Sequence, residues 1–564
     1  MIQSKYVDRL TLGFIAIVML VCLAASILAP KTAVADDSGG SSMEYEQMLF
    51  DTSKPITVDI TMDTDNWQEM LTNATEKKWR SCDVVVNGRR LNNVGIRPKG
   101  DSSLSSIAAN PNTNRYSFML RFDKYQSGQR CWGLDRLCLN NNYGDATNMK
   151  EPMAYDMFRF LGADAPLYNY AVITVNGEYW GTYLALEGVN DAFLRRNYGT
   201  QKGALYKPGD GDGQEEADWE LEEFLEPPSG TGDAASITSD DASAGQLLES
   251  SGEGGADLNY IDENLESYWG IWPSEVTKTK KADHRRVVEA LKNMAEGNAP
   301  EQYVDMDNLL RYMAVHSFTV NNDSLSGDGA HNYYLYESDG CLNLIPWDYN
   351  LCFGAYEMDW GAGTGMPETA TEMVNKPIDE PWQITRFFDI ILSNGEYRAR
   401  YHAYYQKLID EYVLGGGFRR FYSRTRSQID DLVKSDPNAL YSYDAYDAAA
   451  KTLLEAVELR GQSIKGQLAG AIPSTAAGQK EHPEALIDAS SINLRTMGSD
   501  NVGEDAQVQA SEDDWIRFYR EKAEQQNKAR QETNRKMALR YLGSFFGLSV
   551  ALLGLRWYDK RFGD

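Results

Sequence analysis

The chain has 564 residues, 42% of them hydrophobic and 11% aromatic, which is enough to form a substantial buried core. That length fits about two to four domains, or one large domain with two lobes. The formal net charge of −28 at pH 7 argues against nucleic acid as a general partner, because binding to phosphate depends on Lys and Arg side chains.

The N-terminal segment has the features of an export signal. Leu10–Pro30 is an uncharged run, preceded by basic residues and long enough to span a bilayer core of about 30 Å. Residues 33–35, Ala-Val-Ala, have the small side chains of a signal-peptidase site. We interpret residues 1–35 as a signal peptide or a signal anchor, which places the rest of the chain outside the cytoplasm. Residues 36–54 are interpreted as a linker.

Strands that enclose one helix are predicted for the next part of the chain. Val84–Val86 and Val172–Val175 are β-like runs, and each is followed by an Asn-Gly dipeptide that favours the type I′ turn of a hairpin. Between them, Thr147–Leu161 carries Met, Phe and Leu at helical spacing. The sequence therefore predicts an α+β domain, which we place at residues 55–468.

Residues 209–256 are rich in Gly, Ser, Asp and Glu, so a disordered acidic insertion is expected there. Its GDGDG stretch lacks the residue order of a calcium loop. Helices dominate after the insertion, and six are predicted: His284–Gly297, Asp307–Thr319, Gln383–Asn394, Tyr397–Val413, Gly417–Val433 and Asp444–Leu468.

The C-terminal part is predicted to leave the domain and reach a membrane. Residues 469–510 are interpreted as a polar linker and residues 511–540 as a charged stalk helix that begins with a capping box. Residues 541–558 contain a short apolar run flanked by Arg, with Trp and Tyr at its end, so we expect a transmembrane helix or a membrane-docking helix. A basic tail after this run favours a cytoplasmic C-terminus if the helix spans.

The cysteines do not form a zinc motif, because the chain has no C-x-x-C pair and its five histidines are scattered. A Cys131–Cys138 or a Cys341–Cys352 disulfide stays open at this point, and buried free thiols are the alternative.

The richest chemistry lies around a hairpin predicted for residues 332–345, whose Asp339-Gly340 dipeptide favours a type I′ turn. A two-residue loop puts Asn332 opposite Trp347, whereas a one-residue bulge would pair Asn332 with Asp348. In both cases an amide oxygen and a carboxylate meet at the open end of the hairpin.

Asp323 lies just upstream of this hairpin. Two hard oxygen ligands and a further carboxylate are what a phosphotransferase that uses Mg²⁺ and a nucleotide needs. Asp and Asn are also common turn residues, so a purely structural role for the hairpin rim is the alternative.

The chain resembles the family of spore coat protein H (CotH), which are atypical bacterial protein kinases. The resemblance extends over about residues 55–465, and several ordered blocks are more specific than a single motif. The blocks are GIRPKGDSS (Gly95–Ser103), Tyr116–Gly162, VNGEYWGTYLALEGVND (Val175–Asp191), LLRYMAVHSFTVNNDS (Leu309–Ser324) and HNYYLY with IPWDYN (His331–Asn350).

The resemblance implies an atypical protein-kinase-like fold with a strand-rich small lobe and a helical large lobe, with hydrophobic helices at the termini. It also implies ATP and Mg²⁺ (or Mn²⁺) as cofactors. Asp348 and Asn332 match the family's metal ligands, and Asp323 matches the Asp that accepts the proton of the attacking hydroxyl. Asp328 is a rival base, because the loop is longer than in the shortest family pattern. His331 is a candidate for proton transfer or for a packing role.

The resemblance places the phosphate-binding cation at Lys99 or Arg115, and a family Glu near the lobe junction at Glu187. The turn at residues 100–103 either offers backbone N–H groups to phosphate or is a plain hairpin turn. A carboxylate exposed at a strand end is the alternative for Glu187.

Two classes of function follow. The first is a membrane-tethered, extracytoplasmic protein kinase that transfers the γ-phosphate of ATP to Ser or Thr hydroxyls of surface or coat proteins, or the same transfer to a glycan. The second is a cell-surface binding or assembly protein that keeps the kinase fold without catalysis. ATP is normally scarce outside the cytoplasm, which motivates the second; the retention of Asp323, Asn332 and Asp348 favours the first.

Overall fold

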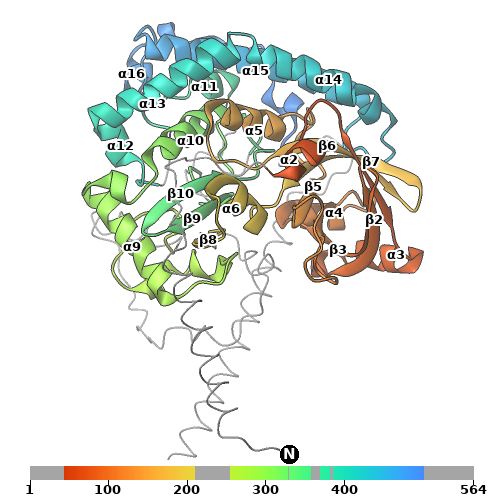
Figure 1. Cartoon of the computed structure of the whole chain (residues 1–564). Helices are drawn as coiled ribbons and strands as arrows, with labels where there is room; N and C mark the ends of the chain where they lie inside the picture. The colour runs from red at the N-terminus through yellow and green to blue at the C-terminus, as the bar shows by residue number, and fades with distance from the viewer. Residues whose placement is uncertain (1–42, 210–253, 328, 357–368, 382–384, 501–564) are drawn as a thin grey trace, which may run out of the picture.

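The computed structural model describes residues 43–209, 254–327, 329–356, 369–381 and 385–500. Seven strands of the first part close into a barrel (Figure 1). Going round the barrel, the order is β1 (Ile56–Thr61), β2 (Arg80–Val86), β3 (Arg89–Lys99), β4 (Ser117–Arg121), β5 (Arg136–Asn140), β7 (Glu178–Glu187) and β6 (Tyr168–Val175). β1 and β6 pair in parallel and the other neighbours pair antiparallel.

Two of the barrel's hairpins confirm the predicted Asn-Gly turns. Asn87 and Gly88 have φ of 44° and 83°, and Asn176 and Gly177 have φ of 53° and 89°. Positive φ at both central residues defines the type I′ turn, whose twist matches that of the flanking strands. These dipeptides set the register of β2 with β3 and of β6 with β7.

The predicted helix between these hairpins is α5 (Lys150–Leu161). It begins later than expected because the Asp145 carboxylate accepts hydrogen bonds from the backbone N–H groups of Thr147 and Lys150, both at 2.9 Å. These bonds make a tight loop that ends in the first turn of the helix. Nine of the twelve residues of α5 are buried, and α5 lies between the barrel and the helices above it (Figure 1).

The first part of the chain also contains shorter helices. They are α2 (Glu44–Leu49), α3 (Thr64–Thr72), α4 (Ser102–Ala109) and α6 (Asp191–Tyr198), with a 3₁₀ turn η1 (Ala74–Glu76).

A second, three-stranded sheet has the order β10 (Cys341–Pro346), β9 (Tyr333–Ser338), β8 (Ala204–Tyr206). Helices pack around it and across the top of the molecule (Figure 1). They are α9 (Lys281–Glu296), α10 (Met306–Thr319), α11 (Ala370–Asn375), α12 (Asp389–Ser393), α13 (Gly395–Lys407), the π-helix η5 (Leu408–Val413), α14 (Gly417–Ser435) and α15 (Tyr443–Leu468), with 3₁₀ turns η2 (Leu265–Tyr268), η3 (Trp272–Ser274) and η4 (Pro300–Gln302).

The described residues form two hydrophobic cores. One fills the barrel and includes Phe118 and Tyr183, and the other joins α5 to the second sheet and the helices, with Tyr312 and Tyr349 among its largest members. The described residues therefore form a mixed fold in which a barrel and a helical part each have their own core.

The predicted helix at residues 383–394 is the main difference among the helices. Within its described residues only Asp389–Ser393 is helical. The backbone N–H of Arg386 donates to the side-chain oxygen of Asn259 at 2.7 Å, and the N–H of Phe387 donates to Thr385 Oγ1 at 3.2 Å. These bonds replace the helical bonds that the periodicity predicts.

Residues 469–500 were expected to be a linker, but the structure packs them on the helical core. The segment holds α16 (Ala476–Glu481), η6 (Pro483–Ala485) and η7 (Leu494–Met497). Ala489 and Met497 are fully buried. The polar composition of the segment did not predict this packing, because only a few widely spaced apolar side chains contact the helical core.

Several predictions fall on residues outside the described part of the chain. These are the N-terminal signal or anchor, the stalk helix, the C-terminal membrane helix and most of the acidic insertion. At the edges of the insertion, Gly209 donates its N–H to Gly270 O at 3.1 Å and Gly270 donates to Gly254 O at 2.9 Å. Within the described residues, no helix is both long and apolar enough to cross a bilayer.

The five described cysteines are free, so neither of the disulfides left open by the sequence is present.

Candidate active site

The β9–β10 hairpin sets the position of two predicted site residues. Asp339 and Gly340 have φ of 53° and 88°, and Tyr333 pairs with Pro346 at the open end. This is the two-residue loop of the sequence prediction, without a bulge. Asn332 precedes β9 and Asp348 follows β10, so both lie at the same end of the hairpin.

Asn332 and Asp348 share an uncommon backbone conformation. Each has a φ of 58°, in the left-handed region that Asn and Asp tolerate better than most residues. Such conformations cost free energy and are concentrated at functional sites.

Asp323 lies beside Asn332, as the sequence predicted. The Asn332 side-chain amide donates to the Asp323 carbonyl oxygen at 2.8 Å and to its carboxylate Oδ2 at 3.1 Å. The other carboxylate oxygen of Asp323 lies 2.8 Å from His331 Nε2. These bonds orient the Asp323 carboxylate and do not use the amide oxygen of Asn332, which is the atom a metal ion needs. The rival base Asp328 lies outside the described residues.

Lys99 is the last residue of β3 and reaches from the barrel towards the hairpin. Its Nζ donates to Asn140 Oδ1 at 2.6 Å and lies 5.5 Å from the ring centroid of Trp347. Because Trp347 immediately precedes Asp348, this contact links Lys99 to the segment that carries the candidate metal ligand.

Glu151, in the first turn of α5, joins this group and was missed by the sequence analysis. Asn140 Nδ2 donates to Glu151 Oε2 at 3.0 Å, so one amide bridges Lys99 and Glu151. Tyr155 OH donates to the other oxygen at 3.1 Å. Burial, followed by the negative charge of Asp348, raises the pKa of Glu151 to about 8. The signal in the sequence was a carboxylate among the Met, Phe and Leu residues at helical spacing in residues 147–161.

Asp348, Glu151 and Asn332 could supply ligands to a divalent cation, because carboxylate and amide oxygens are the hard ligands that Mg²⁺ prefers. The negative charge of Asp348 acts on buried Glu151, and a cation would relieve that repulsion. Among the described residues, no cluster of three or more His, Cys, Asp and Glu side chains forms a metal site, so the fit rests on a mixed set that includes an amide.

A buried histidine joins the segments that carry Asp323 and Asp348. His316, on α10, has its Nδ1 2.7 Å from Tyr349 OH and its Nε2 2.9 Å from Ser326 Oγ. Ser326 Oγ in turn donates to the Asn321 carbonyl at 3.2 Å. Burial lowers the pKa of His316 to about 3, so its ring is neutral at ordinary pH.

Asn321 adds a second link between the same two segments. Its side-chain amide donates to the Asp348 carbonyl at 3.3 Å. Asp323 and Asp348 are therefore positioned relative to each other by two sets of contacts that the sequence analysis did not identify.

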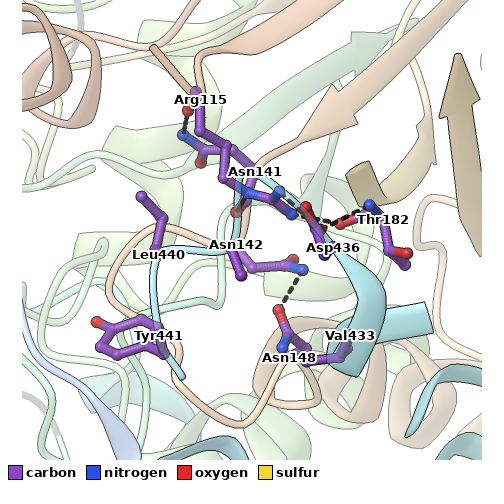
Figure 2. Close-up of a pocket in the computed structure, with 10 residues that line it drawn as sticks. Arg115, Asn141, Asn142, Asn148, Thr182, Val433, Asp436, Leu440 and Tyr441 are labelled. Carbon is purple, nitrogen blue, oxygen red and sulfur yellow. Dashed lines mark hydrogen bonds and ion pairs between the residues drawn. The ribbon is translucent and has the colours of Figure 1, made fainter. Parts of the chain in front are cut away.

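Arg115 lies outside this group. Its guanidinium forms an ion pair with Asp436 at 2.8 Å and donates to the carbonyl oxygens of Asn141 and Thr182 (Figure 2). Both partners of the ion pair are almost completely buried. They line a cavity of about 20 Å³, room for about one water molecule. Of the two cations proposed for the phosphates, the structure brings only Lys99 to the other site residues.

Glu187 is also outside the group, and it is buried rather than exposed. Its carboxylate pairs with Arg196 at 2.6 Å and accepts a hydrogen bond from Tyr45 OH at 2.6 Å. These partners tie β7 to α6 and α2. The turn at residues 100–103 leads into α4 and is not a hairpin turn.

The model of the family described as CotH kinase protein matches residues 96–464, more than half of the chain. The chain therefore belongs to the CotH family. A relative is the inner spore coat protein H of Bacillus subtilis (strain 168), which is 24% identical over 341 residues, covering 60% of this chain and 79% of the relative.

Proposed function

We propose that this chain is an ATP-dependent phosphotransferase that uses Mg²⁺ or Mn²⁺ and phosphorylates Ser or Thr hydroxyls of proteins. The observation that carries the proposal is the bridge from Lys99 through Asn140 to Glu151, together with the contact of Lys99 with Trp347, the neighbour of Asp348. A cation from a strand and a carboxylate from a helix, brought together beside a metal-binding Asp, is the arrangement that protein kinases use to hold nucleotide phosphates. The barrel and the helical part, each with its own core, fit the two lobes of a kinase-like fold.

In this proposal each residue has a distinct task. Asp348 and Asn332 would hold the metal ion, with Glu151 close to it, and the bound ion supplies positive charge against the phosphates. Lys99 donates hydrogen bonds to phosphate oxygens, and Asn140 and Glu151 fix its direction.

Asp323 accepts the proton of the acceptor hydroxyl, whose oxygen forms a bond to the γ-phosphorus as the bond to the β-phosphate oxygen breaks. The leaving group is ADP. His331 and Asn332 keep the Asp323 carboxylate aimed at the acceptor. Most of the rate enhancement comes from this positioning and from charge stabilisation.

The proposed acceptors are surface or coat proteins. The name of the Bacillus subtilis relative places that protein in the inner spore coat. The predicted export signal and C-terminal apolar run of the present chain motivate a membrane-anchored, extracytoplasmic location.

The test is phosphoryl transfer by the full-length chain. The protein is incubated with γ-labelled ATP and Mg²⁺ or Mn²⁺, with and without added acceptor protein. Asp348→Asn is compared with Asp339→Asn: both are Asp residues of the same hairpin region with φ above 50°, and Asn tolerates that conformation. We expect Asp348→Asn to lose transfer and Asp339→Asn to retain it.

Asp323→Asn separates the base from the metal site. We expect it to lose transfer while the thermal shift caused by Mg²⁺ and ATP stays as in the wild type. If the wild type transfers no label and shows no nucleotide-induced thermal shift, the proposal fails. A cell-surface binding protein that keeps the fold without catalysis is then favoured.

A further inference from the structure

The segment after the family-matched region contacts two loops of the candidate site. Ala146 donates its backbone N–H to Met497 O at 3.1 Å, and Tyr143 OH donates to Asp500 O at 3.0 Å. On the other side, Asp500 donates its N–H to Ala355 O at 3.1 Å. Residues 494–500, here called the C-terminal clamp, therefore bond to residues 143–146 and to residue 355.

The first of these loops leads into α5, whose N-cap residue is Met149. Within it, Asp145 accepts the N–H groups of Thr147 and Lys150, and Lys150 is adjacent to Glu151. Asp145 and Lys150 are buried. A displacement of residues 144–146 therefore moves the first turn of α5, where the Glu151 carboxylate lies.

The second loop follows Asp348. Asn350 Nδ2 donates to Tyr143 O at 2.8 Å, so the two loops also contact each other. A methyl group built on Gly144 would lie 2.5 Å from Leu351 Cδ2 and 3.1 Å from Ser499 O. Both loops and the clamp thus meet at Gly144 without room for an added carbon atom.

We propose that the C-terminal clamp is a positioning element of the candidate site: it fixes the loop that leads into α5, where Glu151 lies, and the loop that follows Asp348. This inference deepens the proposed function and rests on it for its effect on turnover. The clamp lies beyond residue 464, where the family model ends. Met497 is fully buried, so the clamp is part of the folded domain.

The test adds a methyl group where the clamp contacts residues 144–146. Gly498 has φ of 88°, and a Cβ there would lie 2.6 Å from Gly144 O and 2.7 Å from Ala146 N. Gly498→Ala must therefore push the clamp and residues 144–146 apart. Gly470→Ala is the matched control, because Gly470 has φ of 71° and nothing lies within 4 Å of its Cβ position.

The readout in the full-length protein is hydrogen–deuterium exchange together with phosphoryl transfer. We expect Gly498→Ala to speed exchange in peptides that cover residues 143–151 and 349–355. We also expect it to lower turnover about tenfold, since a misplacement of about 1 Å costs up to about 100-fold. Gly470→Ala should change neither. Equal exchange in the two variants at these peptides overturns the proposal.

Tyr143→Phe provides a milder test if Gly498→Ala does not fold. It removes only the hydroxyl that bonds to Asp500 O. Faster exchange at residues 349–355 and 494–500 supports the clamp, and unchanged exchange overturns it. If the wild type has no phosphotransferase activity the proposed function fails, while the exchange data still decide whether the clamp holds the two loops.

Discussion

Nδ1 of His316 lies 2.7 Å from the hydroxyl oxygen of Tyr349, the residue that follows Asp348. Nε2 of the same ring lies 2.9 Å from Ser326 Oγ, in the loop that follows Asp323. One buried side chain thus touches the segments of both the candidate base and the candidate metal ligand. Each of its two ring nitrogens contacts one of these segments, so a substitution can remove one contact and keep the other.

The first prediction uses two replacements of His316. Asn places a polar atom close to the position of Nδ1, and Gln places one close to the position of Nε2. We expect His316→Asn to retain the Tyr349 bond and most of the turnover, and His316→Gln to lose about tenfold in turnover because Asp348 is less well positioned. Each variant loses about 1–3 kcal/mol of stability, since one of the two hydrogen bonds of the buried ring is lost. Turnover is measured as a function of Mg²⁺ concentration and corrected for the folded fraction; equal losses would refute the role of the Tyr349 link.

The second prediction concerns the pH dependence of stability. Burial lowers the pKa of His316 from 6.5 to about 3 in the folded protein. Between these values the unfolded chain binds a proton that the folded protein does not, so the free energy of unfolding falls as the pH falls below 6.5. The contribution is about 1.4 kcal/mol per pH unit within this window. Urea midpoints from about pH 7 to pH 4 should decline less steeply for His316→Asn than for the wild type. Parallel plots of midpoint against pH would show that His316 does not cause this pH dependence.

The third prediction separates stability from function at Glu151. The Glu151 carboxylate is buried and feels the charge of Asp348. Glu151→Gln removes that repulsion and keeps the side-chain volume, so we expect the metal-free protein to gain about 1 kcal/mol in stability. The thermal shift caused by Mg²⁺ and ATP should disappear, because the carboxylate at the end of the Lys99–Asn140–Glu151 bridge is lost as a possible metal ligand.

Glu178→Gln is the control for this experiment, since Glu178 is exposed at the start of β7. It should change neither the melting temperature nor the thermal shift. A Glu151→Gln protein that is destabilised and still responds to Mg²⁺ and ATP would show that Glu151 is only structural.

The fourth prediction tests the position of Arg115. Arg115→Met leaves the Asp436 carboxylate buried without its cation, which should cost about 3–5 kcal/mol of stability. Arg121→Met, at the end of β4, breaks a more exposed pair with Asp123 and should cost less than about 1 kcal/mol. ATP affinity, measured at low temperature on folded protein, should be unchanged in both. A large loss of ATP affinity in Arg115→Met alone would restore the phosphate-binding role that the sequence resemblance allowed.

The sequence predicted the local parts of this fold well. The Asn-Gly and Asp-Gly dipeptides gave three hairpins with the expected turns, and the Asp339-Gly340 turn placed Asn332 and Asp348 at one end of β9 and β10. Positive φ at both central residues is a property of the dipeptide itself, so neighbouring residues are enough to predict it. The proximity of Asp323 to Asn332 follows from the same short stretch of chain.

The boundary of the domain was less predictable. Residues 469–500 have the polar composition of a linker, yet Met497 and Ala489 are buried against the helical core. The few apolar residues of this segment contact a surface formed by distant parts of the chain. Their spacing follows neither the helix nor the strand period, so the sequence pattern does not predict their burial.

By itself, the sequence determined the family, the hairpins and the placement of Asn332 and Asp348 at one end of β9 and β10, because turn chemistry and ordered motifs depend on residues close together in the chain. Only the tertiary structure decided which distant charges meet. Lys99 lies beside Asn140 and Glu151, whereas Arg115 pairs with Asp436, and Glu187 pairs with Arg196. A long charged side chain can reach several partners, and its choice depends on which strands and helices the two cores bring together.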